Sequence, residues 1–170
     1  MRTLAGILLA AGLALTPAYK ASTCDDCQTS LIGKVVLRQL EGYMPICYKD
    51  SGGRYTLGYG HLMQSGEHCA TLLPDQAENL LENDLRPKER AINTDLIYRT
   101  KKQTQFDSLI LLVFNIGEYK FQQSHLLKAI NTGESINQIE PLWLEWDKVS
   151  GVTNKGLSYR RGIEFSLYSL

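Results

Sequence analysis

Two acidic residues, Glu41 and Asp50, have the spacing and the predicted surroundings of a catalytic carboxyl pair. Apolar residues at helical spacing from Leu31 to Leu40 predict a short helix, and Gly42 predicts its end, so Glu41 would lie at the helix C-terminus. That end of a helix carries partial negative charge, which favours the protonated form of a carboxyl, and partial burial favours it further. A glutamic acid kept protonated in this way can serve as a general acid.

Asp50 is expected in a different setting, at the edge of an exposed turn. It precedes the Ser-Gly-Gly segment 51–53, which lies between stretches 43–49 and 54–60 that are rich in aromatic and β-branched residues, and this pattern predicts a β-hairpin. An exposed aspartate stays ionised, and Thr56 on the returning strand could hold a water molecule beside it. The two acids would supply one protonated and one ionised carboxyl, as glycoside hydrolysis requires.

The spacing of the two acids is a weak signal by itself, because a solvated helix end and a turn-forming aspartate would explain it equally well. The longer string is more specific. Glu, eight residues, Asp, five residues, Thr and then Leu57–His61 closely resembles the catalytic segment of the phage-type lysozymes, glycoside hydrolase family 24. Segments 114–117 and 156–164 match later motifs of that family in order and approximate spacing, and the resemblance covers about residues 30–170.

The resemblance implies a fold and an activity. The fold would be α+β, a lysozyme-like two-lobed fold in which a small β-hairpin lobe and a larger helical lobe are joined by a long helix. The activity would be that of an endolysin, a muramidase that hydrolyses the β-1,4 bond between N-acetylmuramic acid and N-acetylglucosamine in peptidoglycan and so lyses the bacterial cell. No metal or organic cofactor is implied.

The resemblance also implies a role for each catalytic residue. Glu41 would protonate the glycosidic oxygen, while Asp50 with Thr56 would orient a water on the opposite face of the sugar. The reaction would invert the anomeric carbon, which needs the two carboxyls about 6.5 to 9.5 Å apart. Either Arg160 or Arg161 could pair with Glu41 across the cleft, and such a pair would favour the ionised carboxyl and oppose the effect of burial.

Four further positions are expected, by the same resemblance, to line the saccharide cleft: Leu62, Phe114, Asn115 and Ser124. Two of them also have an ordinary structural explanation, because a Phe inside an apolar helix can belong to the core and a Ser before a helix can be only its cap. His61 is expected to be a structural hydrogen-bond partner rather than a catalyst.

The rest of the chain is predicted to be helical. Helices are expected from Pro74 through Leu85, from Phe106 to Phe114, from Ser124 to near Gly133, from Ser135 through Trp146, and from about Leu157 onward. Thr104 with Asp107 has the pattern of a capping box ahead of the second of these, which is apolar enough to be the central buried helix and is closed by Gly117. Pro87 and Pro141 are candidate kink positions.

Composition and charge limit the partners. A chain of 170 residues with 44% hydrophobic and 21% charged residues can bury the core of one domain. Of its 18 basic residues, Arg2 and Lys20 lie in the first 21 positions, so the remainder carries 16 basic against 18 acidic residues. This slightly negative net charge argues against nucleic acid as a partner. It also means that the protein as a whole is not attracted electrostatically to an anionic cell wall. The basic segment 86–102 is interpreted as a solvated helix face, and we expect a monomer.

The first residues are predicted to be a targeting segment rather than part of the fold. Arg2 precedes the apolar run 4–15, and the charge-free stretch 3–19 has 17 residues, which at 1.5 Å each reaches about 25 Å and falls just short of a typical membrane span. Residues 1–22 would be a signal peptide or a signal-anchor, and residues 23–170 the lysozyme catalytic domain. We favour retention, with export to the periplasm and tethering to the inner membrane by residues 3–19.

The cysteines fit an exported protein. Cys24, Cys27, Cys47 and Cys69 all follow the apolar segment, and in an oxidising compartment they predict up to two disulfides. The favoured bridge, Cys47 to Cys69, would close a loop of about 20 residues and stabilise the fold by about 3 kcal/mol. Cys24 and Cys27 would then pair locally or stay free. A regulatory alternative pairs one of them with Cys47 in a membrane-held form, and a zinc site with His68 is a further alternative.

Two other classes of function remain as alternatives. A catalytically silent cell-wall-binding protein could keep the fold and the cleft, but it has no need of Glu41, Asp50 and Thr56 at the family spacing. A zinc peptidoglycan amidase would require a metal site, for which the sequence offers no second convincing set of histidine ligands.

Overall fold

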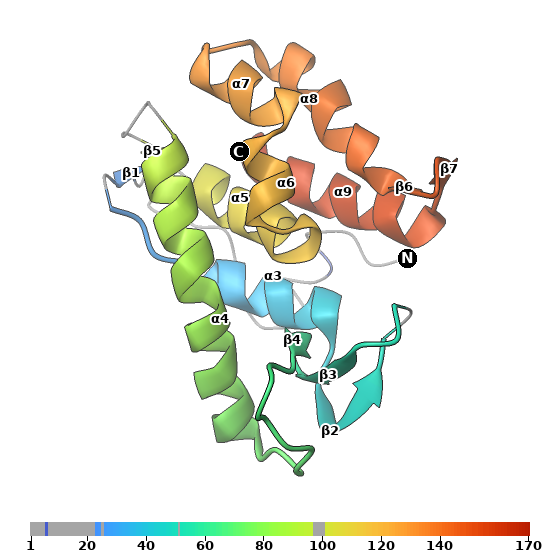
Figure 1. The fold of residues 1–170 in the computed structure, drawn as a ribbon. Coiled ribbons are helices and arrows are strands. Elements are labelled where there is room, and N and C mark those ends of the chain that lie inside the picture. The colour runs from blue at the N-terminus through green and yellow to red at the C-terminus, as the bar shows by residue number, and fades with distance from the viewer. Residues whose placement is uncertain (1–5, 7–22, 25, 51, 97–100) are drawn as a thin grey trace.

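Helices form most of the protein, with short antiparallel strands between them (Figure 1). The computed structural model describes residues 6, 23, 24, 26–50, 52–96 and 101–170. In this part of the chain the elements are β1 (Thr23–Cys24), α3 (Leu31–Glu41), β2 (Met44–Lys49), β3 (Tyr55–Gly58), β4 (His61–Leu62), α4 (Pro74–Asp95), β5 (Lys101–Lys102), α5 (Gln103–Ile116), α6 (Glu118–Gln122), α7 (His125–Asn131), α8 (Ile136–Leu144), the 3-10 helix η1 (Glu145–Asp147), β6 (Lys148–Val149), β7 (Val152–Thr153) and α9 (Lys155–Tyr168).

The predicted N-terminal targeting segment lies outside the described residues, apart from Gly6. None of the helices formed by the described residues is long and apolar enough to cross a membrane. The first described strand, β1, pairs antiparallel with β5 just before α5. The segment that leads to α3 therefore begins beside the start of α5.

The small lobe is built on the predicted hairpin, in which β2 pairs with β3 and β3 with β4. The Gly53 N–H donates to the Asp50 carbonyl at 2.9 Å, and the Gly53 φ of 78° is one that glycine adopts readily. A disulfide between Cys47 and Cys69 joins β2 to the segment after β4, which confirms the favoured pairing. Cys27 is disulfide-bonded as well. In this form of the protein, Cys47 is thus not bonded to an N-terminal cysteine.

A long helix, α4, joins the two lobes, as expected (Figure 1). It has 22 residues and at 1.5 Å each is about 33 Å long. One side of it is buried, through Ala77, Leu81, Leu85 and Ile92. Pro87 lies inside the helix without ending it, because this position is exposed and water can solvate the carbonyl group that loses its hydrogen bond.

The centre of the large lobe is α5, which packs against α3, α4, α6 and α9. Its residues from Phe106 to Val113 are buried on every side, as the apolar pattern predicted. The predicted cap is wrong, because the helix begins at Gln103 and the N-cap is Lys102, whose N–H donates to the Gln105 side chain at 3.4 Å. Asp107 is instead inside the helix and fully buried.

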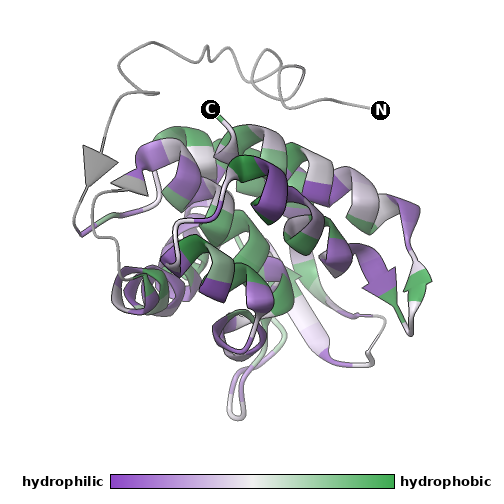
Figure 2. Ribbon diagram, turned by 90° about the horizontal axis from the view of Figure 1, so that it is seen from above, coloured by the Kyte–Doolittle hydropathy of each residue, from purple (hydrophilic) through white to green (hydrophobic). Residues whose placement is uncertain are grey.

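The last helices complete the large lobe around α5 and α9. Ser135 and Gln138 form the predicted capping box of α8, and Pro141 lies inside that helix at an exposed position. The core here is aromatic, with the rings of Trp143 and Tyr168 5.0 Å apart between centroids. Figure 2 shows how hydrophobic and hydrophilic residues alternate along these helices, as expected where one side of each helix packs inward. The expected α+β, two-lobed architecture is confirmed.

Candidate active site

Glu41 is the last residue of α3, as predicted, and its side chain is 17% exposed. Gly42 ends the helix with a φ of 75°. Glu41 Oε1 lies 2.7 Å from Nη1 of Arg160, and the two groups form an ion pair. The other oxygen, Oε2, faces Gly60, where a Cβ atom would lie only 3.1 Å from it. Gly60 therefore leaves room for this carboxyl.

Arg160, from α9, is the arginine that reaches Glu41. Its Nε donates to Glu164 Oε1 at 2.9 Å and its Nη2 to the Leu111 carbonyl of α5 at 3.0 Å, so the guanidinium is held on two further sides. Burial opposes its charge, but the carboxylates of Glu41 and Glu164 outweigh burial and raise the pKa of Arg160. The guanidinium is a fixed positive charge beside Glu41.

Arg161 points to a different group of partners. Its Nη2 donates to Glu164 Oε1 at 2.7 Å and to Asn115 Oδ1 at 3.0 Å. Trp143 Nε1 donates to the other Glu164 oxygen at 3.2 Å, and both Arg161 and Glu164 are fully buried. Arg161 thus belongs to a largely buried polar cluster with Glu164, Asn115 and Trp143. Although it is next to Arg160 in the sequence, it hydrogen-bonds Glu164 and Asn115 rather than Glu41.

Asp50 lies at the hairpin turn, with its carboxylate held by the following backbone. Its Oδ1 accepts the N–H of Arg54 at 2.9 Å and that of Gly52 at 2.8 Å, and its Oδ2 contacts Arg54 Nη2 at 3.1 Å. The backbone N–H of Arg54 is the largest cause that lowers the pKa of Asp50, and the Gly52 N–H and the Arg54 guanidinium act in the same direction. The expected ionised aspartate at an exposed turn is what these contacts favour.

Thr56 lies on β3 opposite Tyr48 of β2 and Leu62 of β4, so it is on the middle strand of the sheet. It is 4% exposed, and its hydroxyl donates to the Arg54 carbonyl at 3.4 Å. Thr56 and Asp50 thus lie on the hairpin that α3 leads into through Glu41.

Two of the four expected cleft residues line one pocket of about 180 Å³ between the lobes. Leu62 comes from β4 and Phe114 from α5, and the other lining residues are Gly60, His61, Gln64, Asp84 and Lys88. Lys88 lies over the Phe114 ring, with Nζ 5.2 Å from the centroid. The sequence pattern does not single out Gln64 or Asp84, and it places Lys88 in the basic segment 86–102 that is interpreted as a solvated helix face. Asp84 and Lys88 are four residues apart on α4, and their spacing on that helix was the available signal.

His61 has the expected hydrogen-bonding role. Its Nδ1 lies 2.9 Å from Asp84 on α4 and its Nε2 lies 3.0 Å from Glu67. Burial disfavours the charged ring, but the two carboxylates outweigh burial and raise the pKa of His61. His61 therefore joins the sheet to the long helix and to the segment that follows β4.

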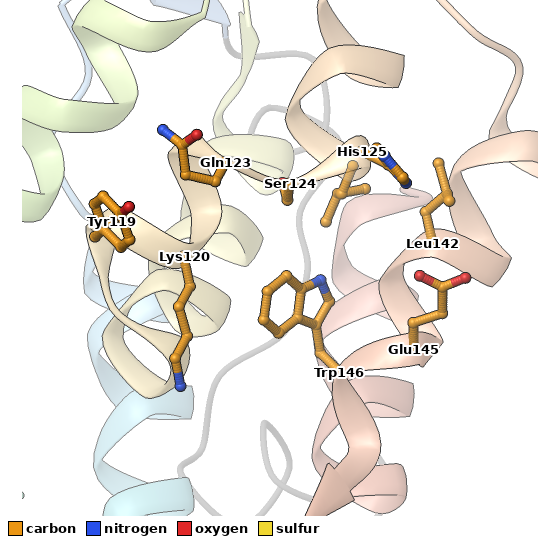
Figure 3. Close-up of a pocket in the computed structure, with 9 residues that line it drawn as sticks. Tyr119, Lys120, Gln123, Ser124, His125, Leu142, Glu145 and Trp146 are labelled. Carbon is orange, nitrogen blue, oxygen red and sulfur yellow. The ribbon is translucent and has the colours of Figure 1, made fainter. Parts of the chain in front are cut away.

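Ser124 lines a second pocket, of about 390 Å³, on the large lobe (Figure 3). The other lining residues include Tyr119, Lys120, Gln123, His125, Leu142, Glu145 and Trp146. The Ser124 hydroxyl accepts the Leu127 N–H at 3.0 Å and donates to the Phe121 carbonyl at 2.6 Å, so it also caps α7. Asn115, the fourth expected cleft residue, is exposed and is held by Arg161.

The zinc alternative loses its sulfur ligands. Cys69 is bonded to Cys47, and Cys27 is also in a disulfide, so neither can offer a thiolate to a metal. Within the described ranges, no three His, Cys, Asp or Glu side chains are grouped as metal ligands would be.

Comparison with known proteins gives a consistent set of relatives. The family model described as phage lysozyme matches residues 38–164. The endolysin of Acyrthosiphon pisum secondary endosymbiont phage 1 is 34% identical over 142 residues, covering 80% of this chain and 94% of that endolysin. The SAR-endolysin of Enterobacteria phage P21 is 34% identical over 125 residues, 74% of each chain.

A solved structure has the same arrangement of elements. The muramidase domain of SpmX from Asticaccaulis excentricus superposes with a TM-score of 0.74 at 30% identity, covering 83% of this chain and 97% of that domain. The match spans only 53% and 55% of the longer endolysins of Bacillus phages B103 and PZA.

Proposed function

Because the chain belongs to the phage lysozyme family, we propose that it is an endolysin whose muramidase activity cleaves the β-1,4 bond between N-acetylmuramic acid and N-acetylglucosamine in peptidoglycan. The observation that carries the proposal is the contrast between two carboxyls of the small lobe. Glu41 is largely enclosed and faces a buried guanidinium, while Asp50 is at a turn whose backbone favours its ionised form. An inverting glycosidase uses one carboxyl as the acid and one as the base, and in this proposal the enclosed Glu41 is the acid and the ionised Asp50 is the base.

In this proposal Glu41 is the general acid that protonates the glycosidic oxygen. Glu41 is paired with Arg160 in the free protein, so this contact must loosen as substrate enters and water leaves the cleft. Arg160, still attached to Glu164 and Leu111, would stay near the site and bind the carboxylate again once the proton has been transferred.

Asp50 acts in this proposal as the base, and with Thr56 it orients the water that attacks the opposite face of the sugar. A water attacking from that face inverts the anomeric carbon. Proton NMR of the first product formed from peptidoglycan oligosaccharides tests this directly. The initial product should be the α-anomer, and an initial β-anomer would show retention and a covalent route instead.

The substrate-binding residues of the proposal are Leu62, Phe114, Asn115 and Ser124. In the pocket at Leu62 and Phe114 these two side chains would contact the apolar face of a sugar ring, and Gly60, which also lines this pocket, faces Glu41. The Ser124 pocket carries Lys120 and Glu145 with Trp146, so it could accept a charged, partly apolar group (Figure 3). The two pockets would hold different parts of one long polymer.

The test of the activity is the release of reducing ends from purified peptidoglycan. The wild-type protein should release them, and Glu41→Gln, which removes the proton donor with little change of shape, should lose about 100- to 10,000-fold. Retention of more than about a tenth of the activity by the folded variant would exclude Glu41 as the acid. A cell-wall-binding protein would release nothing, and an amidase would release new amino groups and be inhibited by a chelator.

We further propose that the protein is exported to the periplasm as a monomer without nucleic-acid partners, and is tethered to the inner membrane by residues 3–19. Support comes from the apolar N-terminal sequence and from the SAR-endolysins among its relatives. Intact mass spectrometry of the periplasmic protein decides between retention and cleavage. A mature chain that begins at Tyr19 or Ala21 would mean ordinary secretion and would end the tethering proposal.

A further inference from the structure

The segment before α3 is held to the large lobe by side chains from two other helices. Glu89 of α4 accepts both the N–H and the hydroxyl of Thr29, at 2.8 and 2.7 Å. Asn93, one turn further along α4, accepts the Cys27 N–H at 3.2 Å and donates to the Cys27 carbonyl at 2.8 Å. The start of α3 is thus placed by polar contacts of defined direction, not only by apolar packing.

The most buried of these contacts is made by Asp107 of α5. This carboxylate is fully buried, and its two oxygens accept the N–H of Ser30 at 2.9 Å and the Ser30 hydroxyl at 2.5 Å. Gln103 donates to it as well, at 3.0 Å. Ser30 is the N-cap of α3, and its hydroxyl in turn accepts the Gly33 N–H at 3.1 Å. Asp107 therefore holds the residue at which α3 begins.

The other end of α3 is also held from α5. Glu41, the last residue of α3, pairs with Arg160, and Arg160 donates to the Leu111 carbonyl of α5. Asp107 and Leu111 are four residues apart, about one helical turn. Both ends of the 11-residue helix α3 are thereby connected to neighbouring turns of one buried helix.

Helices α3 and α5 pack so closely that no room is left for an added side-chain atom between them. Gly33, in the first turn of α3, lies against Asp107, and a Cβ atom at Gly33 would be 2.7 Å from Asp107 Cγ. A contact this short forces either the carboxylate or the helix to move. The contacts of Asp107 with Ser30 and Gly33 thus fix both the distance between α3 and α5 and the position of α3 along α5.

From these contacts we propose that Asp107 is a positioning residue for catalysis, which holds α3 in the place where Glu41 meets the glycosidic oxygen. The inference rests on the proposed function of Glu41. Asp107 touches neither substrate nor reacting atoms and acts through Ser30 and the helix. A shift of the helix by about 1 Å would leave the binding pockets formed by β4, α4 and α5 in place but would misplace the proton donor.

Two independent variants test this. Asp107→Asn replaces one acceptor oxygen by a donor, and Gly33→Ala presses the helix away from an intact Asp107. Both should lower kcat on soluble peptidoglycan fragments about 10- to 100-fold, since a misplacement near 1 Å can cost as much, while KM stays within about twofold. The control is Gly162→Ala on α9, which also introduces a methyl group into a helix but where the added Cβ meets no atom within 4 Å.

The outcomes separate this inference from the proposed function. A fall in kcat for both variants, with unchanged KM, an unchanged near-ultraviolet circular dichroism spectrum and normal kcat for Gly162→Ala, supports positioning. Normal kcat in the folded variants, or a change in KM alone, overturns it while the wild-type protein remains an active muramidase. An equal loss of kcat in Gly162→Ala overturns it too. A wild-type protein that releases no reducing ends would contradict the proposed function itself.

Discussion

At the scale of single residues, the candidate site is built around the Glu41 carboxyl, which lies between the Arg160 guanidinium and Gly60. Arg160 is bound to Glu41, Glu164 and the Leu111 carbonyl, so its charge cannot swing away from the cleft. Gly60 faces Glu41 from the small lobe. Glu41, the proposed proton donor, is therefore set between the two lobes, and small changes around it should affect turnover more than folding.

Gly60→Ala should test this view of the proton donor. The added Cβ would lie 3.1 Å from Glu41 Oε2, and the φ of 85° is unfavourable for alanine, so we expect a stability loss of about 1 kcal/mol and a loss of turnover of at least about tenfold. Gly133→Ala, at a φ of 73° with no neighbour within 4 Å of the added atom, is the control for backbone strain alone. Equal kcat in the two folded variants would contradict the prediction.

His61 predicts how stability depends on pH. The pKa of His61 is raised in the folded protein above its usual value of 6.5. Its bonds to Asp84 and Glu67 therefore stabilise the fold fully at pH values below 6.5, where the ring is protonated. The stabilisation is lost as the pH rises through the folded pKa. Urea denaturation between about pH 5.5 and pH 9 should show this loss in the wild type and a weaker one in His61→Gln. His68→Gln should behave as the wild type, and a His61→Gln profile that matches the wild type would exclude this role.

At the scale of elements, the small lobe depends on a covalent link because its sheet is small. β3 has four residues and β4 two, which gives few ladder hydrogen bonds and little area for a core. The Cys47–Cys69 bridge joins the edge strand β2 to the segment that leads to α4. The bridge therefore stabilises the hairpin that carries Asp50, because it fixes strand β2 to the segment that follows β4.

Replacement of Cys47 and Cys69 together by serine should lower the free energy of unfolding by about 3 kcal/mol in the chain-entropy model. Amide hydrogen exchange should rise in residues 44–72 and stay low in α9, because the bridge constrains only the small lobe. Equal increases in both regions would mean that the bridge supports the whole fold.

At the scale of the whole molecule, the net charge is zero, although the site itself holds charged side chains such as Glu41 and Arg160. The sequence has equal numbers of basic and acidic residues, and several basic side chains are already paired with acids on neighbouring elements, as Lys34 is with Glu82. A net field that steers the protein to an anionic polymer is therefore absent.

The rate of hydrolysis at low substrate concentration should consequently change by less than about threefold between about 50 and about 200 mM salt, since screening has little net attraction to remove. Initial rates on soluble peptidoglycan fragments measure this without the complication of swelling in the intact wall. A steep fall with salt would show that the basic segment 86–102 steers binding, contrary to its interpretation as a solvated helix face. Neutralising Arg86 and Arg90, two exposed members of that segment, would then remove the salt dependence.

Local sequence signals predicted the parts of the site that neighbouring residues determine. Gly42 ends α3, so Glu41 is at a helix C-terminus, and Asp50 lies at a hairpin edge just before Gly52 and Gly53. The bridge between Cys47 and Cys69 also follows from their places around one hairpin. Caps, turns and loop closure act over a few residues, which is why one sequence is enough to predict them.

The tertiary structure alone decided which distant groups meet. Arg160 and Arg161 are adjacent in sequence but point about 100° apart around α9, and only the packing of α9 against α5 turns Arg160 toward Glu41. Asp107 had the local pattern of a helix cap, yet it is buried against Ser30, 77 residues away in the chain. Such choices depend on which side of each helix is covered by a neighbour, and that is determined by the packing of the whole core rather than by any short segment.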